Sequence, residues 1–577
     1  MVDQAIQQKV DQWLNSSIDR ESKLQIEELQ KDPKTLTDAF YKDLEFGTGG
    51  LRGIIGIGSN RINKYTIGKA TQGLANYLNQ SFSSSDIQVA IAYDSRNKSD
   101  YFAKVTAQVF AANGITVHLF ESLRPTPELS FAIRELKCQA GIVITASHNP
   151  KEYNGYKAYW NDGAQLVPPH DKNVMAQVGA IESFDQIKFE GNQQLIKSIG
   201  TEIDEKYLSM IEGLVVNNQV ISQQHDLKIV YSSIHGTGIT MVPEILKRIG
   251  FSNVTIVEEQ AEPDGNFPTV VYPNPEEQEA MSLALAKAGE IDADLIMATD
   301  PDTDRVGIGV KNHHGEFQLL NGNQAGVLLI HYLLDQWKAN NKISDSNYIV
   351  KTIVTTNLID DIAAAYQVDC FNTLTGFKWI AEIIGKLEGN REFIVGGEES
   401  YGYMVGEEVR DKDAVASCAI LAELAAYCKQ DGQSMFDRLI SIYQQYGYYK
   451  ESLISITKPG KSGAEEIQEI MKNLRQNPPK SFAESPIVKI MDYQSSEALD
   501  VASNNLERIE LPKSNVLQFL TSDGSKISAR PSGTEPKIKF YISVKGRLAS
   551  YADFDSSSQL LDLKIDQIKQ NLKDFSS

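Results

Sequence analysis

Short apolar runs alternate with amphipathic stretches along the first four-fifths of the chain, and this pattern recurs weakly three times. Apolar runs bounded by polar turns predict buried strands, and amphipathic stretches between them predict helices. The predicted strands lie at 89–93, 115–120 and 141–144, at 227–231, 254–257 and 293–299, and at 348–354, 368–371 and 392–395. The predicted helices lie near 101–113, 242–249 and 358–366. Strands that alternate with helices imply crossover connections, so we predict an α/β protein with mixed, mostly parallel sheets.

The last part of the chain has a different pattern. Residues 462–481 form a charged stretch with helical periodicity that includes Pro478 and Pro479, and a domain boundary is expected just before it, around 445–460. Short strands are predicted at 516–519 and 538–544, and a final amphipathic helix at 558–572. The tail is therefore expected to form a separate domain.

Composition is that of a soluble globular protein. The 577 residues suggest about four domains, and 41% hydrophobic with 23% charged residues is an ordinary balance. A formal net charge of −20 argues against a general nucleic-acid binder, because such proteins hold phosphates with lysine and arginine. The N-terminus lacks a signal-peptide pattern, and no apolar run approaches the roughly 18 residues of a membrane span. Four cysteines without a C-x-x-C pair predict neither a zinc site nor a disulfide scaffold, so a cytoplasmic location is expected.

The last strand of each repeat leads into a polar loop, at 145–150, 300–305 and 396–402. In open α/β sheets, ligands bind beyond the carboxyl ends of the strands. Because the three units are similar, their loops emerge at corresponding edges. Three segments that are distant in sequence are therefore expected to face one cleft.

The second of these loops carries three carboxylates at alternate positions, those of Asp300, Asp302 and Asp304. Carboxylates that close repel one another unless a hard divalent cation holds them together, which predicts a metal site. An EF-hand loop is excluded, because Arg305 and Lys311 stand where that loop has glycine and glutamate. A solvated acidic turn remains the alternative.

Ser147 lies in the loop that follows the strand at 141–144. A serine hydrolase would need glycine two positions away on either side, where Thr145 and Asn149 stand. A serine can also carry a phosphoryl group, and a metal-binding aspartate trio is a natural partner for that chemistry. The alternative is a turn-forming serine without chemistry.

Two further groups of polar residues suit a sugar phosphate. Glu398 and Ser400, on a glycine-flanked loop, offer a carboxylate and a hydroxyl to neighbouring sugar hydroxyls, although a solvated Glu398 explains that loop equally simply. A phosphate clamp is indicated by the guanidinium, hydroxyls and exposed backbone of Arg530, Ser532, Gly533 and Thr534. An ordinary Pro-Ser-Gly turn is the alternative there.

These motifs occur together in a fixed order: TASHNP at 145–150, DPDTDR at 300–305, GEESYG at 397–402 and RPSGT at 530–534. With them the chain resembles the α-D-phosphohexomutase family. The loops at 46–52, 374–379 and 410–413 fit as well. Residues 46–52, 375–379 and 398–404 are most similar to bacterial α-phosphoglucomutases and the phosphopentomutase-like branch. The resemblance spans roughly residues 40–545.

The resemblance implies a four-domain enzyme with a central cleft, in which three similar α/β/α domains precede a smaller α+β domain. The expected segments are an N-terminal helical extension at 1–40, a phosphoserine domain at 41–215, a metal-binding domain at 216–325, a sugar-binding domain at 326–455 and a phosphate-binding domain at 456–577.

The resemblance also implies roles for single residues. Ser147 would be the phosphoserine, and the Mg²⁺ ligands would be Asp300, Asp302, Asp304 and a phosphate oxygen on Ser147. Arg305 would steady the phosphoryl group, Arg52 would contact the reacting phosphate, and His148 and Lys157 are alternatives for proton transfer. The sugar would be oriented by Thr375, Gly376, Lys378, Glu398, Ser400 and Lys412. The non-reacting phosphate would be held by Arg530, Ser532, Gly533 and Thr534.

The implied reaction is the reversible interconversion of glucose 1-phosphate and glucose 6-phosphate, primed by glucose 1,6-bisphosphate. Mannose and pentose phosphates remain alternative substrates of the same mechanism. A magnesium-dependent sugar phosphatase is an alternative of another class. A catalytically silent sugar-phosphate sensor is disfavoured, because a binding protein needs no nucleophile. The expected partners are small-molecule sugar phosphates, and neither nucleic acid nor a membrane is expected.

Overall fold

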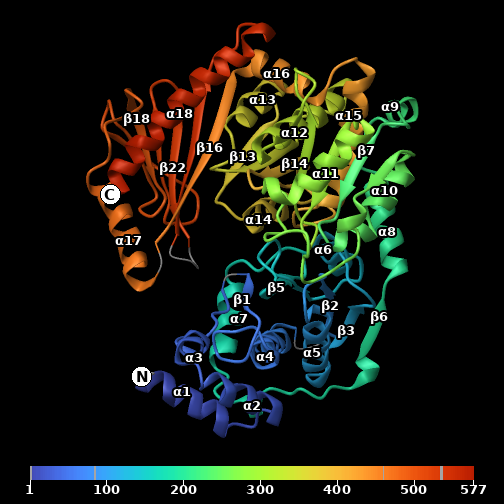
Figure 1. Ribbon diagram of the computed structural model, residues 1–577, viewed down its shortest axis with the longest axis vertical. Coiled ribbons are helices and arrows are strands. Elements are labelled where there is room, and N and C mark those ends of the chain that lie inside the picture. The colour runs from blue at the N-terminus through green and yellow to red at the C-terminus, as the bar shows by residue number, and fades with distance from the viewer. Residues whose placement is uncertain (1–2, 48, 83–85, 459, 533–536, 577) are drawn as a thin grey trace. The chain divides into compact units, whose positions relative to one another are not determined.

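The computed structural model describes residues 3–47, 49–82, 86–458, 460–532 and 537–576 (Figure 1). The chain divides into two compact units. The first comprises the residues up to Ala325 together with Phe377–Ser434, and the second comprises Gly326–Gly376 together with the residues from Met435 onward. The predicted site residues are distributed over both units.

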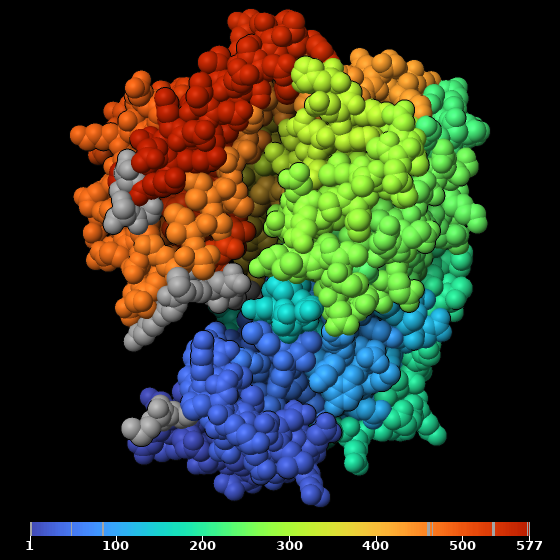
Figure 2. Space-filling view, in the orientation of Figure 1, coloured from blue at the N-terminus to red at the C-terminus, as the bar shows by residue number. Residues whose placement is uncertain are grey.

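Three helices begin the first unit: α1 (Gln4–Asn15), α2 (Arg20–Leu29) and α3 (Pro33–Phe40). Each follows an aspartate whose carboxylate accepts hydrogen bonds from backbone N–H groups of the first turn. Trp13 lies in their shared core, and its ring centroid is 5.6 Å from that of Phe40 and 6.0 Å from that of Tyr65. Tyr65 belongs to the first α/β domain, so the three helices share a hydrophobic core with that domain. In Figure 2 the N-terminal part of the chain forms one continuous blue surface.

The first sheet has the strand order β1-β5-β4-β2-β3-β6. Its strands are β1 (Gly50–Ile54), β2 (Gln88–Tyr93), β3 (Thr116–Phe120), β4 (Ala140–Ile144), β5 (Tyr153–Trp160) and β6 (Ile196–Ile199). The associated helices are α4 (Lys64–Ser81), α5 (Ser99–Ala112), α6 (Thr126–Glu135) and α7 (His170–Gly179). Strands β4, β2, β3 and β6 pair in parallel, whereas β5 pairs antiparallel to both β4 and β1.

Strand alternation places helices on both faces of this sheet. Val89 and Ile91 of β2 pack into a core that also contains side chains from α4 and α5. Gly141 of β4 lies against Ile133 of α6, where an added Cβ would come within 2.3 Å of the Ile133 Cδ1 atom. The loop that carries Ser147 therefore leaves a strand that is fully buried.

The second sheet has the order β11-β10-β9-β7-β8. Its strands are β7 (Ile229–Ser232), β8 (Val254–Ile256), β9 (Leu295–Thr299), β10 (Val306–Lys311) and β11 (Phe317–Leu320). The helices in this region are α8 (Thr201–Glu212), α9 (Asn218–Gln223), α10 (Val242–Ile249) and α11 (Gln278–Ile291). β7 pairs in parallel with β8 and β9, and β9 and β10 form an antiparallel pair around the loop that carries the three aspartates.

The rest of the first unit contains α14 (Phe377–Leu387), β14 (Glu392–Glu398), β15 (Gly402–Val405) and α15 (Ala414–Gln430). β14 and β15 pair antiparallel, so Glu398 stands at the end of a hairpin, opposite Gly402. Asp413 begins α15 by accepting a hydrogen bond from the backbone N–H of Ala416.

The second unit holds most of α12 (Gly322–Ala339), followed by β12 (Asn347–Thr352), α13 (Leu358–Tyr366), β13 (Asp369–Thr373) and α16 (Met435–Tyr446). β12 and β13 pair in parallel. The other strands of this unit are β16 (Tyr448–Thr457), β17 (Ser481–Phe482), β18 (Ser485–Asp492), β19 (Glu497–Asp500), β20 (Asn505–Arg508), β21 (Leu517–Thr521), β22 (Lys526–Pro531) and β23 (Lys537–Gly546). They form one antiparallel sheet, accompanied by α17 (Gly460–Gln476) and α18 (Phe554–Ser576).

The C-terminal part differs from the sequence-based expectation in two places. The helix predicted over 462–481 ends at Gln476, because Pro478 and Pro479 lack the N–H that a helix needs, and Ser481 begins β17 instead. The boundary predicted at 455/456 falls inside β16, all of whose ten residues pair with β23. We therefore propose that the C-terminal domain begins near Tyr448.

Replacing Trp13 by alanine should destabilise the N-terminal segment. A buried tryptophan truncated to alanine costs about 3–5 kcal/mol, because its contacts with Phe40 and Tyr65 are lost and a cavity remains. We expect the first denaturant transition, followed by circular dichroism, to move to lower denaturant concentration. Leu24→Ala is the control, because Leu24 is 53% exposed. Equal transitions for the two variants would contradict a shared core.

Candidate active site

Ser147 lies directly beyond the carboxyl end of β4 and is 3% exposed. Its backbone has a φ of 53°, a left-handed conformation that costs a non-glycine residue on the order of 1–3 kcal/mol. The Ser147 N–H donates to the Thr145 hydroxyl at 2.8 Å. The Ser147 Oγ atom donates to Asp300 Oδ2 at 2.9 Å and lies 3.1 Å from His148 Nδ1. The strained turn therefore directs the hydroxyl toward the aspartate loop.

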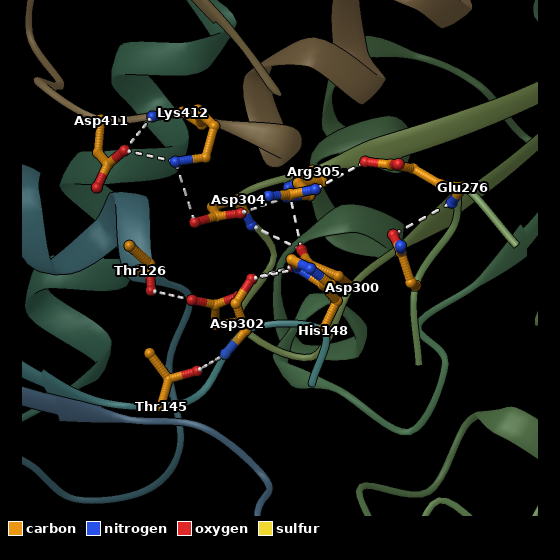
Figure 3. A network of polar contacts seen from close by, with 12 residues as sticks. Thr126, Thr145, His148, Glu276, Asp300, Asp302, Asp304, Arg305, Asp411 and Lys412 are labelled. Carbon is orange, nitrogen blue, oxygen red and sulfur yellow. Dashed lines mark hydrogen bonds and ion pairs between the residues drawn. The ribbon is translucent and has the colours of Figure 1, made fainter. Parts of the chain in front are cut away.

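The aspartate loop connects β9 to β10 and brings three buried carboxylates together. One oxygen of each lies within 4.8 Å of the others, for Asp300, Asp302 and Asp304 (Figure 3). Asp300 Oδ1 accepts hydrogen bonds from the backbone N–H groups of Asp304 at 3.1 Å and Arg305 at 3.0 Å. The turn between them includes Thr303 in a left-handed conformation, with a φ of 56°.

Positive side chains surround these carboxylates. Lys157 Nζ lies 2.6 Å from Asp302 Oδ2 and 2.9 Å from Asp304 Oδ2. Lys412 Nζ lies 3.3 Å from Asp304 Oδ2 and 3.0 Å from Asp411 Oδ1. Burial alone would lower the pKa of Lys157, but the carboxylates of Asp302 and Asp304 outweigh it and raise that pKa to about 12. These ammonium groups therefore offset much of the carboxylate repulsion.

The carboxylates of Asp300 and Asp304 differ in how strongly they hold a proton. Burial and the charges of Asp302 and Asp304 raise the pKa of Asp300 well above its ordinary value. Burial also opposes ionisation of Asp304, but Lys157 and Lys412 lower its pKa. The neighbouring carboxylates therefore disfavour the ionised form of Asp300, and a bound cation would offset this repulsion.

A divalent metal ion fits this donor set. Asp302 Oδ1 and Asp304 Oδ1 are buried and accept no hydrogen bond from the residues that the structure describes, although Arg305 Nε lies 3.8 Å from Asp304 Oδ1 and Asp302 Oδ2 accepts from the Thr126 hydroxyl at 3.0 Å. Buried carboxylate oxygens without partners are rare unless an ion satisfies them. Oxygen ligands are those that hard divalent cations prefer.

The three remaining residues predicted to act in the reaction lie beside Ser147 and the aspartates. Arg305 forms an ion pair with Glu276 at 2.7 Å and approaches Asp304 at 3.8 Å. Arg52 donates from Nη1 to Asn149 Oδ1 at 3.3 Å, two residues beyond Ser147. Burial, together with the positive charges of Arg305 and Arg52, holds the pKa of His148 well below its ordinary value.

The residues predicted to orient the sugar are divided between the two units. Glu398 is 6% exposed at the end of β14, and its charge contributes to raising the pKa of Lys412. Ser400 follows in the turn between β14 and β15, and Lys378 lies in the first turn of α14, with its ammonium 4.9 Å from the Trp379 ring centroid. Thr375 and Gly376 belong to the second unit.

The predicted phosphate-holding residues are in the second unit. Arg530 lies near the end of β22, opposite Lys539 of β23, and the Ser532 N–H donates to the Lys537 carbonyl at 2.7 Å. Gly533 and Thr534 lie outside the described residues, as does Thr48 of the motif at 46–52.

Several residues of the site were not found from the sequence. Thr126, the first residue of α6, bonds to Asp302, which lies 176 positions later, and Glu276, in a turn before α11, bonds to Arg305. Arg96 donates to the carbonyl of Ser147. The one available signal for Arg96 was an Asp-Ser-Arg sequence directly after a predicted strand, the position where functional loops of α/β sheets begin.

Fold and site together fit an enzyme that transfers phosphoryl groups, because a buried serine hydroxyl contacts a trio of buried carboxylates on α/β domains. Family models confirm this class. Domains I, II and III of phosphoglucomutase/phosphomannomutase, each described as alpha/beta/alpha, match residues 43–185, 205–315 and 321–446. The chain belongs to the phosphoglucomutase/phosphomannomutase family of phosphohexomutases, which are intramolecular phosphotransferases.

Characterised relatives cover nearly the whole chain. A phosphoglucomutase of Staphylococcus haemolyticus is 38% identical over 520 residues, which are 89% of this chain and 93% of the relative. A phosphoglucomutase of Staphylococcus aureus is 38% identical over 531 residues, covering 92% of this chain and 93% of the relative. The predicted resemblance to the α-D-phosphohexomutases is confirmed.

Solved structures share the fold. A putative phosphomannomutase from Thermus thermophilus is 22% identical, covers 90% of this chain and 99% of its own, and has a TM-score of 0.66. Parafusin, a phosphoglucomutase from Paramecium, is 18% identical, covers 93% and 96%, and has a TM-score of 0.68. The predicted fold class, three α/β/α domains with mixed sheets followed by a further domain, is confirmed. Among the described residues, no helix is long and apolar enough to cross a membrane.

Asp302→Asn should lower turnover about 100-fold or more, because the substitution removes a charged ligand from the carboxylate trio. We also expect weaker binding of Mn²⁺, used as a paramagnetic substitute and measured by electron paramagnetic resonance. Asp226→Asn in the same domain is the control, because Asp226 is exposed. Unchanged Mn²⁺ affinity in Asp302→Asn would refute the assignment of this carboxylate as a ligand.

Proposed function

We propose that the protein interconverts glucose 1-phosphate and glucose 6-phosphate through a phosphoserine at Ser147 and a glucose 1,6-bisphosphate intermediate. The observation that carries the proposal is the 2.9 Å contact between Ser147 Oγ and Asp300 Oδ2, within a trio of buried carboxylates. The relatives that cover about nine-tenths of the chain are named phosphoglucomutases, which favours glucose over other sugars. Among the described residues the four cysteines form no disulfide, which is compatible with the cytoplasm as the place of action.

Asp300, Asp302 and Asp304 would hold Mg²⁺, together with a phosphate oxygen on Ser147. When bound, the ion would neutralise negative charge as the phosphoryl group moves between oxygen atoms. The buried Oδ1 atoms of Asp302 and Asp304, which accept no hydrogen bond from the described residues, support this assignment.

The chain's own side chains would do the rest of the chemistry. The bond between phosphorus and Ser147 Oγ breaks as a bond to a free sugar hydroxyl forms, and that hydroxyl loses its proton. Burial and nearby arginines hold the pKa of His148 well below its ordinary value, which favours the neutral imidazole that a proton acceptor needs, and His148 Nδ1 lies 3.1 Å from Ser147 Oγ. We assign His148 as the proton acceptor and Lys157, whose pKa is raised to about 12, as a permanent positive charge beside the phosphoryl group.

The bisphosphate must then turn, so that its other phosphate returns to Ser147. Thr375, Gly376, Lys378, Glu398, Ser400 and Lys412 would orient the sugar in both directions. Arg530, Ser532, Gly533 and Thr534 would hold whichever phosphate is not reacting. Water must be kept from the phosphoserine while the sugar is bound, because hydrolysis would otherwise compete with transfer to the sugar.

Ser147→Ala should abolish mutase turnover while sugar phosphate still binds, because only the nucleophile is removed. Turnover is measured by a coupled assay with Mg²⁺ and glucose 1,6-bisphosphate, using glucose, mannose, glucosamine and ribose 1-phosphates in parallel. Intact-mass spectrometry of the wild type should find one added phosphoryl group, and peptide mapping should place it on Ser147. An unphosphorylated wild type after turnover would refute the mechanism, and release of inorganic phosphate faster than isomerisation would indicate a phosphatase.

Arg530→Ala should raise the KM for glucose 1-phosphate about tenfold or more, because a charged hydrogen bond to phosphate contributes about 1.5–3 kcal/mol. Arg508→Ala is the matched control, since Arg508 is 81% exposed on β20 of the same sheet. A change in thermal stability alone, with KM unaltered, would remove Arg530 from the phosphate site.

A further inference from the structure

Arg96 follows β2 and has a fully buried side chain. Its guanidinium donates to four backbone carbonyls of the loop that carries Ser147. Nη1 bonds to the oxygens of Pro150 at 2.9 Å and Tyr153 at 3.1 Å, and Nη2 bonds to those of Ser147 and Asn149. A planar guanidinium can satisfy several fixed acceptors at once, which an ammonium cannot do in the same geometry.

Asp94 fixes the direction of this arginine. Its Oδ2 atom lies 3.3 Å from Arg96 Nε, and both side chains are completely buried. Asp94 Oδ1 accepts from the Arg96 N–H at 2.9 Å and from the Ser99 hydroxyl at 2.7 Å. The Asp94 N–H donates to the carbonyl of Ile144, the last residue of β4. The pair is therefore anchored where the serine loop begins.

The other face of Arg96 meets the second α/β domain. The Phe267 ring centroid lies 5.0 Å from Arg96 Cζ, within the range of a cation–π contact. Next to it, Asn97 Nδ2 donates to the Gly265 carbonyl at 3.3 Å and to Asn266 Oδ1 at 3.1 Å. A Cβ atom at Gly265 would lie 2.3 Å from the Asn97 nitrogen, so this approach requires glycine.

The loop that carries Phe267 is in turn tied to the aspartate loop. The Asp264 N–H donates to the His235 carbonyl, and His235 Nδ1 lies 3.0 Å from the Glu262 carbonyl. Two residues beyond His235, the Thr237 N–H donates to the Pro301 carbonyl at 2.8 Å, and the Thr237 and Thr303 hydroxyls are 2.7 Å apart. Arg96 thus stands between the segment that holds Ser147 and the domain that holds Asp300.

We propose that Arg96, stacked on Phe267, is a positioning residue that sets the Ser147 Oγ atom against the aspartate trio. The side-chain hydrogen bonds that Arg96 donates to described residues go to backbone carbonyls of residues 147–153, and not to Ser147 Oγ or to the carboxylates of the trio. Arg96 therefore acts through the backbone of that segment. Ser147 has a strained φ of 53°, so its carbonyl needs such an external restraint. The inference rests on the proposed phosphoserine mechanism.

The test separates the rate of phosphoryl transfer from the amount of folded enzyme. Dephosphorylated protein is mixed with glucose 1,6-bisphosphate and Mg²⁺, quenched at intervals, and analysed by intact-mass spectrometry. For Arg96→Lys, we expect the transfer rate constant and kcat to fall together by about 30- to 100-fold, with KM for glucose 1-phosphate within about threefold of wild type. A folding defect alone would lower the final extent of phosphorylation and leave the rate constant unchanged.

Phe267→Leu keeps all four carbonyl bonds and removes only the ring, so it tests the proposal even if Arg96→Lys fails to fold. We expect its transfer rate constant to fall about three- to tenfold, with KM unchanged. Arg61→Lys is the matched control, because Arg61 is also buried, pairs with Asp38 and donates to the carbonyls of Asp38 and Asn60. It should lose thermal stability without losing transfer rate.

A wild-type rate constant in both Arg96→Lys and Phe267→Leu would overturn the positioning role. So would a fall in Arg61→Lys equal to that in Arg96→Lys. Failure of the wild type itself to gain a phosphoryl group on Ser147 is a different outcome, because it would remove the proposed function rather than this inference alone.

Discussion

Mutual repulsion of three buried carboxylates is the constraint around which the first unit is built. Asp300, Asp302 and Asp304 bring their oxygens within 4.8 Å of one another in a place from which water is excluded. Bringing like charges that close is unfavourable unless opposite charges compensate. Lys157, Lys412 and Arg305 supply part of that compensation, and a metal ion held by the three carboxylates, as proposed above, would supply the rest.

The compensation comes from different segments of the chain, and this links the α/β domains. Lys157 lies on β5 of the first sheet, the aspartates lie in the loop between β9 and β10 of the second sheet, and Lys412 precedes α15. The hydrogen bond from Ser147 to Asp300 also joins the first α/β domain to the second. A site formed between these two domains has an advantage for phosphoryl transfer, because the proposed nucleophile and the proposed metal ligands are each held rigidly by a separate sheet.

The sequence correctly predicted those strands and loops that are marked by a local pattern of residues. The strands before Ser147 and Asp300 are continuous apolar runs, and the loops after them are marked by residue types with distinctive chemistry. Several strands were not predicted, among them β19 and β20, because β20 is exposed along its whole length and neither strand has the apolar alternation that predicts a strand.

Residues that act through tertiary contacts were beyond the reach of sequence patterns. Thr126 lies 176 positions before Asp302, and only the fold brings its hydroxyl to that carboxylate. In the sequence, Arg96 is one polar residue after a strand, and Phe267 is one aromatic residue in a proline-rich turn. Their significance depends on a stacked geometry that no spacing in the chain encodes.

The second unit has its own internal constraint, a buried lysine at the start of β22. Lys526 is 7% exposed, and its ammonium donates to the Ile353 carbonyl at 2.9 Å and to Asn357 Oδ1 at 2.5 Å, while Gln518 Nε2 donates to the same Ile353 carbonyl at 2.8 Å. A buried ammonium persists only where such acceptors surround it.

These bonds connect the two groups of substrate residues proposed for this unit. The Ile353 N–H donates to the carbonyl of Thr373, two residues before Thr375, and β22 runs from Lys526 to the segment that bears Arg530. The distance between the sugar-orienting Thr375–Gly376 and the phosphate-holding Arg530 is therefore set by contacts inside one unit. A clamp that must accept a phosphate from either end of a turning sugar needs such a fixed spacing, because it cannot adjust to each orientation separately.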